Sequence, residues 1–117
     1  MQNTVFALIQ RKIRGFKFEL TRGTAVLNGF RLFKCSCNMP KSYKLICTDD
    51  SSKPELSWTT LIEINEKTEN EHEILDIYEF PHPSPPTRFV RLVLTGKNWS
   101  DQLHLQFLHF DLFGSYF

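Results

Sequence analysis

Histidine is the residue type whose chemistry is easiest to test against spacing, because imidazole binds metals and exchanges protons near neutral pH. The four histidines are His72, His82, His104 and His109. A β-bulge between His104 and His109 would turn both toward solvent, but five strand residues at about 3.3 Å each separate them by about 16 Å. One ion cannot bridge that distance. The histidine spacing therefore predicts no metal site.

Acidic residues gather in two turn-rich segments, Asp49-Asp50 and Glu69 to Glu73. We interpret them as solvated turn residues rather than as the paired carboxylates of an acid-base catalyst. The chain also lacks a G-x-S-x-G elbow, a P-loop and a glycine-rich dinucleotide turn. We therefore expect neither enzymatic activity nor a cofactor.

Three cysteines, Cys35, Cys37 and Cys47, make an odd number, whereas secreted domains more usually hold an even disulfide framework. Two close thiols without a neighbouring histidine or third cysteine make a poor zinc site. We expect three free thiols. The early apolar stretch "VFALI" is too short for a membrane helix, and basic residues follow it rather than precede it as in a signal peptide. These features predict a cytoplasmic protein.

Two arginines and two tryptophans allow more than one interpretation. Arg88 and Arg91 in "TRFVRL" could clamp a carboxylate or a phosphate, but opposite faces of one strand favour a salt bridge inside the domain. Trp58 opens an alternating segment and is expected in the core. Trp99 stands in a polar turn, where a partly exposed tryptophan can contact a partner.

Charge is distributed unevenly although the formal net charge is only +1. Residues 1–34 hold seven Lys or Arg residues and a single acid, Glu19. This excess predicts either solvated strand faces with complementary charges or a basic docking edge. The candidate edge residues are Arg11, Lys12, Arg14 and Lys17. The small net charge does not favour nucleic acid as a partner.

Two-residue periodicity dominates the remaining sequence. "FKFEL" places Phe16, Phe18 and Leu20 on one face, and "YKLIC" repeats the alternation. "WTTLIEI" predicts a strand with Trp58, Thr60, Ile62 and Ile64 on a common face, and "AVLNGFRLF", "HEILDIYEF" and "RFVRLVLT" are further candidates. Seven or eight short strands separated by turn-rich segments predict an all-β antiparallel sandwich.

The last strand changes phase. Its apolar residues alternate at Leu103, Leu105 and Phe107 and then shift by one residue to Leu108, Phe110 and Leu112. A β-bulge at Phe107-Leu108 would let both groups pack inward. Gly96 and Asn98 are expected to form the turn that precedes this strand.

Several of these segments together resemble the discoidin, or coagulation-factor type C, domain, particularly its intracellular branch found beside BTB and kelch-type modules. The matching residues are Pro40, Asp49 to Ser52, Trp58, Leu61, Arg88 to Leu92, Gly96, Asn98 and Phe110 to Gly114. The resemblance covers residues 16–117 and implies an eight-stranded jelly roll similar to galactose-binding domains. Residues 1–15 are expected to form an N-terminal strand or arm.

The resemblance also implies ligand loops at one end of the sandwich. The segment Cys37, Asn38, Met39, Pro40 and Lys41 occupies the place of one such loop, and Trp99 is a second candidate contact. The front portion of the family, with loops that hold lipid or sugar, is shortened here. The first interpretation is therefore a non-catalytic protein-interaction or structural module. The alternative is a carbohydrate- or lipid-binding module.

The shortened front also predicts an uncovered sheet edge. Either "NTVFALIQ" supplies a strand, or a partner adds one by β-augmentation. Because Val5, Phe6, Leu8 and Ile9 are too few to replace a hairpin, we expect a structural subunit embedded in an assembly. The basic edge would then dock on an acidic surface, such as a cytoskeletal filament or a ribonucleoprotein.

Overall fold

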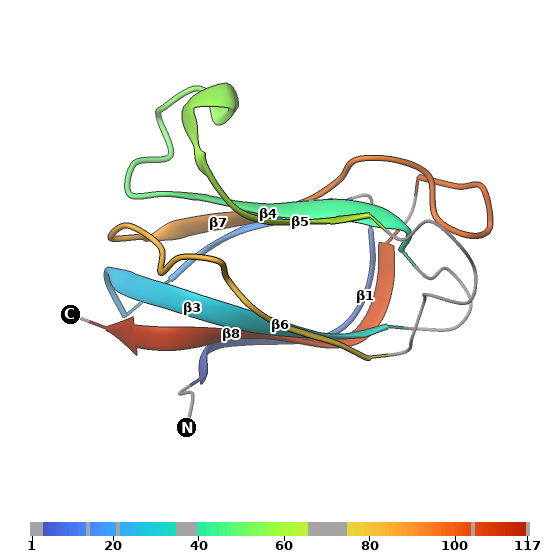
Figure 1. Ribbon diagram of the computed structural model, residues 1–117, viewed down its shortest axis with the longest axis horizontal. Helices are drawn as coiled ribbons and strands as arrows, with labels where there is room; N and C mark the ends of the chain where they lie inside the picture. The colour runs from blue at the N-terminus through green and yellow to red at the C-terminus, as the bar shows by residue number, and fades with distance from the viewer. Residues whose placement is uncertain are drawn as a thin grey trace.

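Eight β-strands and one short 3-10 helix make up the described part of the chain (Figure 1). The computed structural model describes residues 4–13, 15–20, 22–34, 40–65, 75–103 and 105–116, with the backbone alone for 5–13, 15–16 and 105–106. The elements are β1 (Thr4–Ile13), β2 (Gly15–Glu19), β3 (Ala25–Lys34), β4 (Ser42–Thr48), η1 (Glu55–Ser57), β5 (Thr59–Asn65), β6 (Leu75–Glu79), β7 (Phe89–Leu94) and β8 (Leu105–Tyr116). The described chain is all-β.

The strands form two antiparallel four-stranded sheets that pack as a β-sandwich. One sheet has the order β1-β8-β3-β6 and the other the order β2-β7-β4-β5 (Figure 1). The first strand pairs with the last, β2 with β7, β3 with β6, and β4 with β5. The predicted antiparallel sandwich is confirmed.

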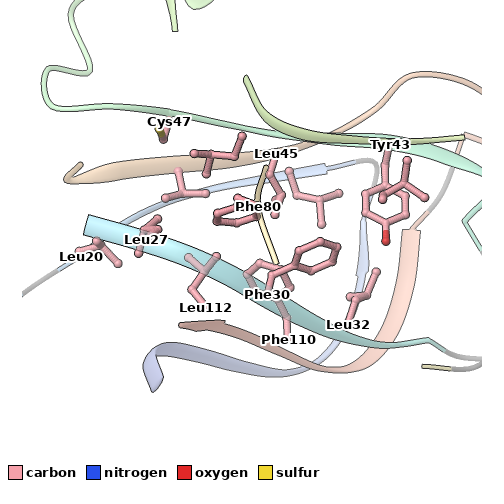
Figure 2. Close-up of a cluster of buried hydrophobic side chains, with 14 of the residues drawn as sticks. Leu20, Leu27, Phe30, Leu32, Tyr43, Leu45, Cys47, Phe80, Phe110 and Leu112 are labelled. Carbon is pink, nitrogen blue, oxygen red and sulfur yellow. The ribbon is translucent and has the colours of Figure 1, made fainter. Parts of the chain in front are cut away.

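The core lies between the two sheets and is rich in aromatic rings (Figure 2). The ring of Phe30 lies 6.2 Å from Tyr43, 6.1 Å from Phe80 and 6.3 Å from Phe110, centre to centre. Inward residues of β4 follow the predicted alternation, since Tyr43, Leu45 and Cys47 are all fully buried. Burying these rings contributes to the hydrophobic stabilisation of the fold.

The chain itself supplies the edge strand next to β8. β1 spans ten residues and pairs with β8 from Thr4 opposite Phe113 to Ile13 opposite Leu105. The chain then crosses to the other sheet, where β2 pairs with β7 from Gly15 to Glu19. The N-terminal segment is therefore longer than predicted and covers this edge without a partner, so the uncovered edge no longer argues for an assembly.

The predicted bulge in the last strand is present. Phe33 of β3 pairs with His109 and the next residue, Lys34, pairs with Phe107, so Leu108 is the extra residue in β8. Phe107 and Phe110 are consequently both fully buried. Leu108 was expected to pack inward, and this expectation is wrong, because the bulged residue points outward and is 44% exposed.

Two further expectations about buried faces are also wrong. Leu103 is 43% exposed because it lies before β8 rather than in the strand. In β5, the register shifts between Leu45 and Ile46 of β4, so Leu61 becomes an extra residue. Leu61 is buried and Thr60 is exposed, which breaks the predicted common face of that strand.

Candidate interaction surfaces

Two of the predicted contact residues meet at one end of the sandwich. The ammonium nitrogen of Lys41, just before β4, lies 4.7 Å from the ring centre of Trp99, in the loop between β7 and β8. This distance is within the range of a cation–π interaction. Three other residues of the predicted ligand loop that contains Lys41, namely Cys37, Asn38 and Met39, lie outside the described residues.

Asn98 holds the loop that carries Trp99. Its side chain is almost fully buried, and its Oδ1 accepts the backbone N–H groups of Ser100 at 2.9 Å and Gln102 at 3.0 Å. The backbone N–H of Asn98 donates to the carbonyl of Gln102 at 2.7 Å, and Asp101 adopts a positive φ of 60°. The predicted turn-forming role of Asn98 is thereby explained by three hydrogen bonds.

The predicted basic edge is divided between the two sheets. Arg11 and Lys12 belong to β1 of one sheet and Lys17 to β2 of the other, while Arg14 lies outside the described residues. The ammonium nitrogen of Lys17 lies 5.7 Å from the ring centre of Trp58. Trp58 is buried, as predicted. Lys17 is therefore already engaged within the chain, and a docking partner would compete with Trp58 for its ammonium group.

The two arginines of "TRFVRL" both form ion pairs within the chain. Arg88 Nε lies 2.7 Å from a carboxylate oxygen of Glu19, and one Nη of Arg91 lies 2.6 Å from Glu55. The preference for an internal salt bridge is confirmed for both. Each pair is about half exposed and contributes little to stability, but it occupies the guanidinium that an anion clamp would need.

The outer surface of the β8-β3-β6 sheet carries apolar side chains that were not predicted to be exposed. Phe33 of β3 lies between His109 of β8 and Leu75 of β6, and its neighbour on the same face, Arg31, lies opposite Ile77. Phe33 is 40% exposed and Ile77 57% exposed, and Leu108, next to His109 in the β8 bulge, is 44% exposed. We call Phe33, Ile77 and Leu108 with Arg31 and His109 the outer apolar face.

An ordered ion cluster stands beside these apolar residues. Asp111 is almost fully buried, and its Oδ2 accepts hydrogen bonds from Nε and Nη2 of Arg31 at 2.8 and 2.5 Å. Its other oxygen lies 2.7 Å from Nε2 of His109. The guanidinium carbon of Arg31 also lies 5.8 Å from the ring centre of Phe113. Asp111 thus holds the guanidinium of Arg31 and the imidazole of His109 in fixed positions on the face.

Two adjoining hollows lie where β4 ends and β5 begins, beside the segments that flank η1. One has a volume of about 260 Å³ and is lined by Cys47, Thr48, Asp49, Lys53, Ser57, Thr59, Pro85 and Pro86. The other has about 230 Å³ and is lined mainly by Thr59 to Leu61 and Pro81 to Pro85. Lys53 and Asp49 form an ion pair of 3.1 Å at the rim.

Cys47 is a free thiol in the first hollow. Burial raises the pKa of this thiol, and a hydrogen bond with Thr87 offsets only part of that effect. Since the thiolate is the reactive form, the hollow does not contain an activated cysteine. The expectation of a free thiol is confirmed for Cys47, whereas Cys35 and Cys37 lie outside the described residues.

Within the described ranges, no group of three or more His, Cys, Asp or Glu residues is arranged to hold a metal ion. The same residues include no helix with the length and apolarity needed to span a bilayer. No protein-family model matches the chain, and no curated protein sequence matches it.

Proposed function

We propose that the chain is a non-catalytic protein-interaction module that serves as a structural subunit of an intracellular assembly. The observation that carries this proposal is the outer apolar face. Three large apolar side chains, Phe33, Ile77 and Leu108, are each 40% exposed or more and come from three adjacent strands. Large exposed apolar side chains gathered on one face of a sheet favour an interaction site.

The composition of the face fits a protein partner. Protein interfaces are enriched in aromatic residues and arginine, with apolar centres and polar rims. Phe33 supplies an aromatic anchor, and Arg31 remains 42% exposed while its guanidinium is held by Asp111. Because the ion cluster is already ordered, a partner would lose little conformational entropy in meeting it.

The charged side chains and the thiol that could do chemistry are engaged in contacts within the chain, which supports a non-catalytic role. Arg88 and Arg91 are paired with glutamates, Asp111 is held by two partners, and Cys47 is kept protonated. An enzyme site would need such groups converging on a cavity with perturbed pKa values.

We further propose that the sandwich is a jelly roll of the discoidin type. In a jelly roll a long antiparallel hairpin is rolled up, so that its first strand pairs with its last and the inner strands pair in turn. The pairs β1·β8, β2·β7, β3·β6 and β4·β5 support this topology. The bulged last strand and the Asn98 turn support the resemblance to discoidin domains.

Charge-introducing substitutions test the proposed surface. Phe33→Glu and Ile77→Glu place a carboxylate on the outer apolar face, and Leu56→Glu places one on η1, where Leu56 is fully exposed. Each variant and the wild type are expressed in the source cells, and copurifying proteins are quantified by mass spectrometry. We expect one or more proteins to be lost with both face variants and retained with Leu56→Glu. Equal recovery with all three variants would refute the proposed surface.

The alternative function is binding of carbohydrate or phospholipid, and the contact between Lys41 and Trp99 favours it. An indole and an ammonium held together can stack on a sugar ring or meet a lipid phosphate. A glycan array and a liposome sedimentation assay test it directly. Saturable binding that Trp99→Ala abolishes and Leu56→Ala preserves would replace the first proposal with this one.

A further inference from the structure

Three polar side chains meet inside the sandwich, between the two sheets. The ammonium nitrogen of Lys34 in β3 lies 3.0 Å from Oδ1 of Asp76 in β6. The hydroxyl of Tyr43 in β4 donates to the other oxygen, Oδ2, at 2.5 Å. The side chains of Lys34 and Asp76 are 0% and 4% exposed, and Tyr43 is fully buried.

Several apolar residues lie next to this cluster. Lys34 pairs across the sheet with Phe107, and Asp76 lies opposite Leu32. The ring of Phe30 meets the ring of Tyr43 edge to face. In Figure 2, Tyr43 points from the β4 sheet toward the β3 sheet, with its oxygen at the far tip. A buried ion pair in such surroundings loses its hydration and is often less stable than an apolar replacement.

We propose that Lys34 and Asp76 condense to form an isopeptide bond that covalently joins β3 to β6. Nζ of Lys34 already lies 3.0 Å from one oxygen of the Asp76 carboxyl group, so the reaction is intramolecular and needs no bimolecular encounter. Water is a product of the reaction. The burial of all three side chains limits the access of water and so disfavours the reverse hydrolysis.

The reaction balances without a further reagent. A proton first passes from Lys34 Nζ to Asp76 Oδ1 across their 3.0 Å contact, which leaves a neutral amine and a neutral carboxylic acid. Nζ then attacks Cγ, and a new N–C bond forms in a tetrahedral intermediate. One amine proton moves to the Oδ1 hydroxyl, the C–Oδ1 bond breaks, and one water molecule leaves. The net change converts one ammonium and one carboxylate into an amide and water.

Tyr43 has a defined part in this reaction. Its hydroxyl donates to Oδ2, the oxygen that stays with Cγ and carries negative charge in the tetrahedral intermediate. A donor placed at that oxygen beforehand stabilises the charge as it develops. Tyr43 is therefore the catalytic residue of the proposed condensation.

Intact mass under denaturing conditions tests the proposal on the full chain. We expect purified wild type to be lighter than its sequence mass by one water, and Lys34→Arg to have its full mass. Fragmentation of a protease digest should show a branched peptide that joins the segments containing Lys34 and Asp76. Wild type at full sequence mass would overturn the proposal, and this result does not depend on whether any variant folds. Water loss that persists in Lys34→Arg would indicate a cyclic imide instead and would also overturn it.

Tyr43→Phe tests the assigned catalytic residue. The variant removes only the hydroxyl, so we expect the crosslinked fraction of newly synthesised protein to rise more slowly over time after cell-free translation than in wild type. The circular dichroism spectrum shows whether the variant has folded. Crosslinking at the wild-type rate in a folded Tyr43→Phe variant would refute the role of Tyr43, while the mass of the wild type still decides the bond itself.

Discussion

The ammonium nitrogen of Lys41 lies 4.7 Å from the ring centre of Trp99, although the two residues are far apart in the sequence. The backbone N–H of Thr95, just after β7, also donates a hydrogen bond to the carbonyl of Ser42, at the start of β4, at 3.0 Å. The segment entering β4 and the loop leaving β7 are therefore held as one surface.

The contribution of this contact can be measured. Lys41→Met keeps the apolar stem and removes the charge, and we expect the free energy of unfolding to fall by about 0.5–1 kcal/mol. Urea denaturation followed by tryptophan fluorescence measures the change. Lys97→Met is the matched control, because Lys97 is more exposed and lies 3.7 Å from Asp101. A loss for Lys97→Met as large as that for Lys41→Met would argue against a specific contribution.

Removing the side-chain acceptor of Asn98 should destabilise the loop that carries Trp99. Asn98→Ala leaves the N–H groups of Ser100 and Gln102 without their acceptor, and we expect a loss of about 1–3 kcal/mol in the free energy of unfolding. Asn98→Asp keeps an acceptor oxygen and should lose less. Asn65→Ala is the control, because its one side-chain hydrogen bond, from Ser42, is exposed. Equal losses in Asn98→Ala and Asn65→Ala would contradict this reasoning.

Gly114 lies where β8 passes very close to β3. A Cβ atom at this position would meet the carbonyl oxygen of Val26 at 2.1 Å and Cα of Leu27 at 2.9 Å. Because both are backbone atoms, Gly114→Ala should cost at least about 1–3 kcal/mol and lower the thermal midpoint. At Gly96 the nearest atom, Cβ of Ser42, is 3.7 Å away, so Gly96→Ala is the control. If Gly114→Ala were as stable as wild type, β8 and β3 would have to move apart at this point to accommodate the methyl group, contrary to our expectation.

The Cys47 thiol makes stability depend on alkaline pH. Its pKa is raised in the folded state above the ordinary value of 9.0, mainly by burial. Between the ordinary and the raised pKa the folded chain holds a proton that the unfolded chain has released, so this contribution to stability decreases as pH rises through that window. Cys47→Ala should show a smaller decrease above pH 9.0 when both proteins are unfolded by urea. If the stability of wild type and of Cys47→Ala fell equally with pH, the buried Cys47 thiol would not be the cause of the decrease.

Native alkylation gives a second measurement on the same thiol. Because Cys47 is buried and protonated, we expect iodoacetamide to modify it far more slowly in the native protein than in urea. Peptide mapping separates Cys47 from the other two cysteines. Rapid native modification would mean that the first hollow opens readily to solvent.

Local periodicity was sufficient to predict much of this sandwich. The alternation in "FKFEL" and "YKLIC" predicted β2 and β4, and the phase change at Phe107 predicted the bulge in β8. These features depend on the two-residue period of a single strand. The bulge at Leu61 was missed because "WTTLIEI" fits a regular strand equally well, and only pairing with β4 fixes its register.

The surfaces were harder to predict because they depend on pairing between distant segments. Phe33, Ile77 and Leu108 come to lie on one sheet only when β3 pairs with both β6 and β8. Lys34 and Asp76 each occur at a position that continues an apolar alternation, in segments where a charged residue is normally interpreted as solvent-facing. For Trp99 the polar turn around it was a usable signal, since the exposure of that loop follows from its composition.

The pairing of β1 with β8 also determines how the domain responds to mechanical force. Thr4 lies opposite Phe113, so the start of β1 and the end of β8 emerge at the same end of one sheet (Figure 1). Tension that pulls these two strand ends apart acts across the ladder and opens its hydrogen bonds one after another, as in unzipping. A sheet pulled lengthwise would instead load all of its bonds at once. Under tension applied through its ends, this domain should yield at low force, with β1 peeling away first.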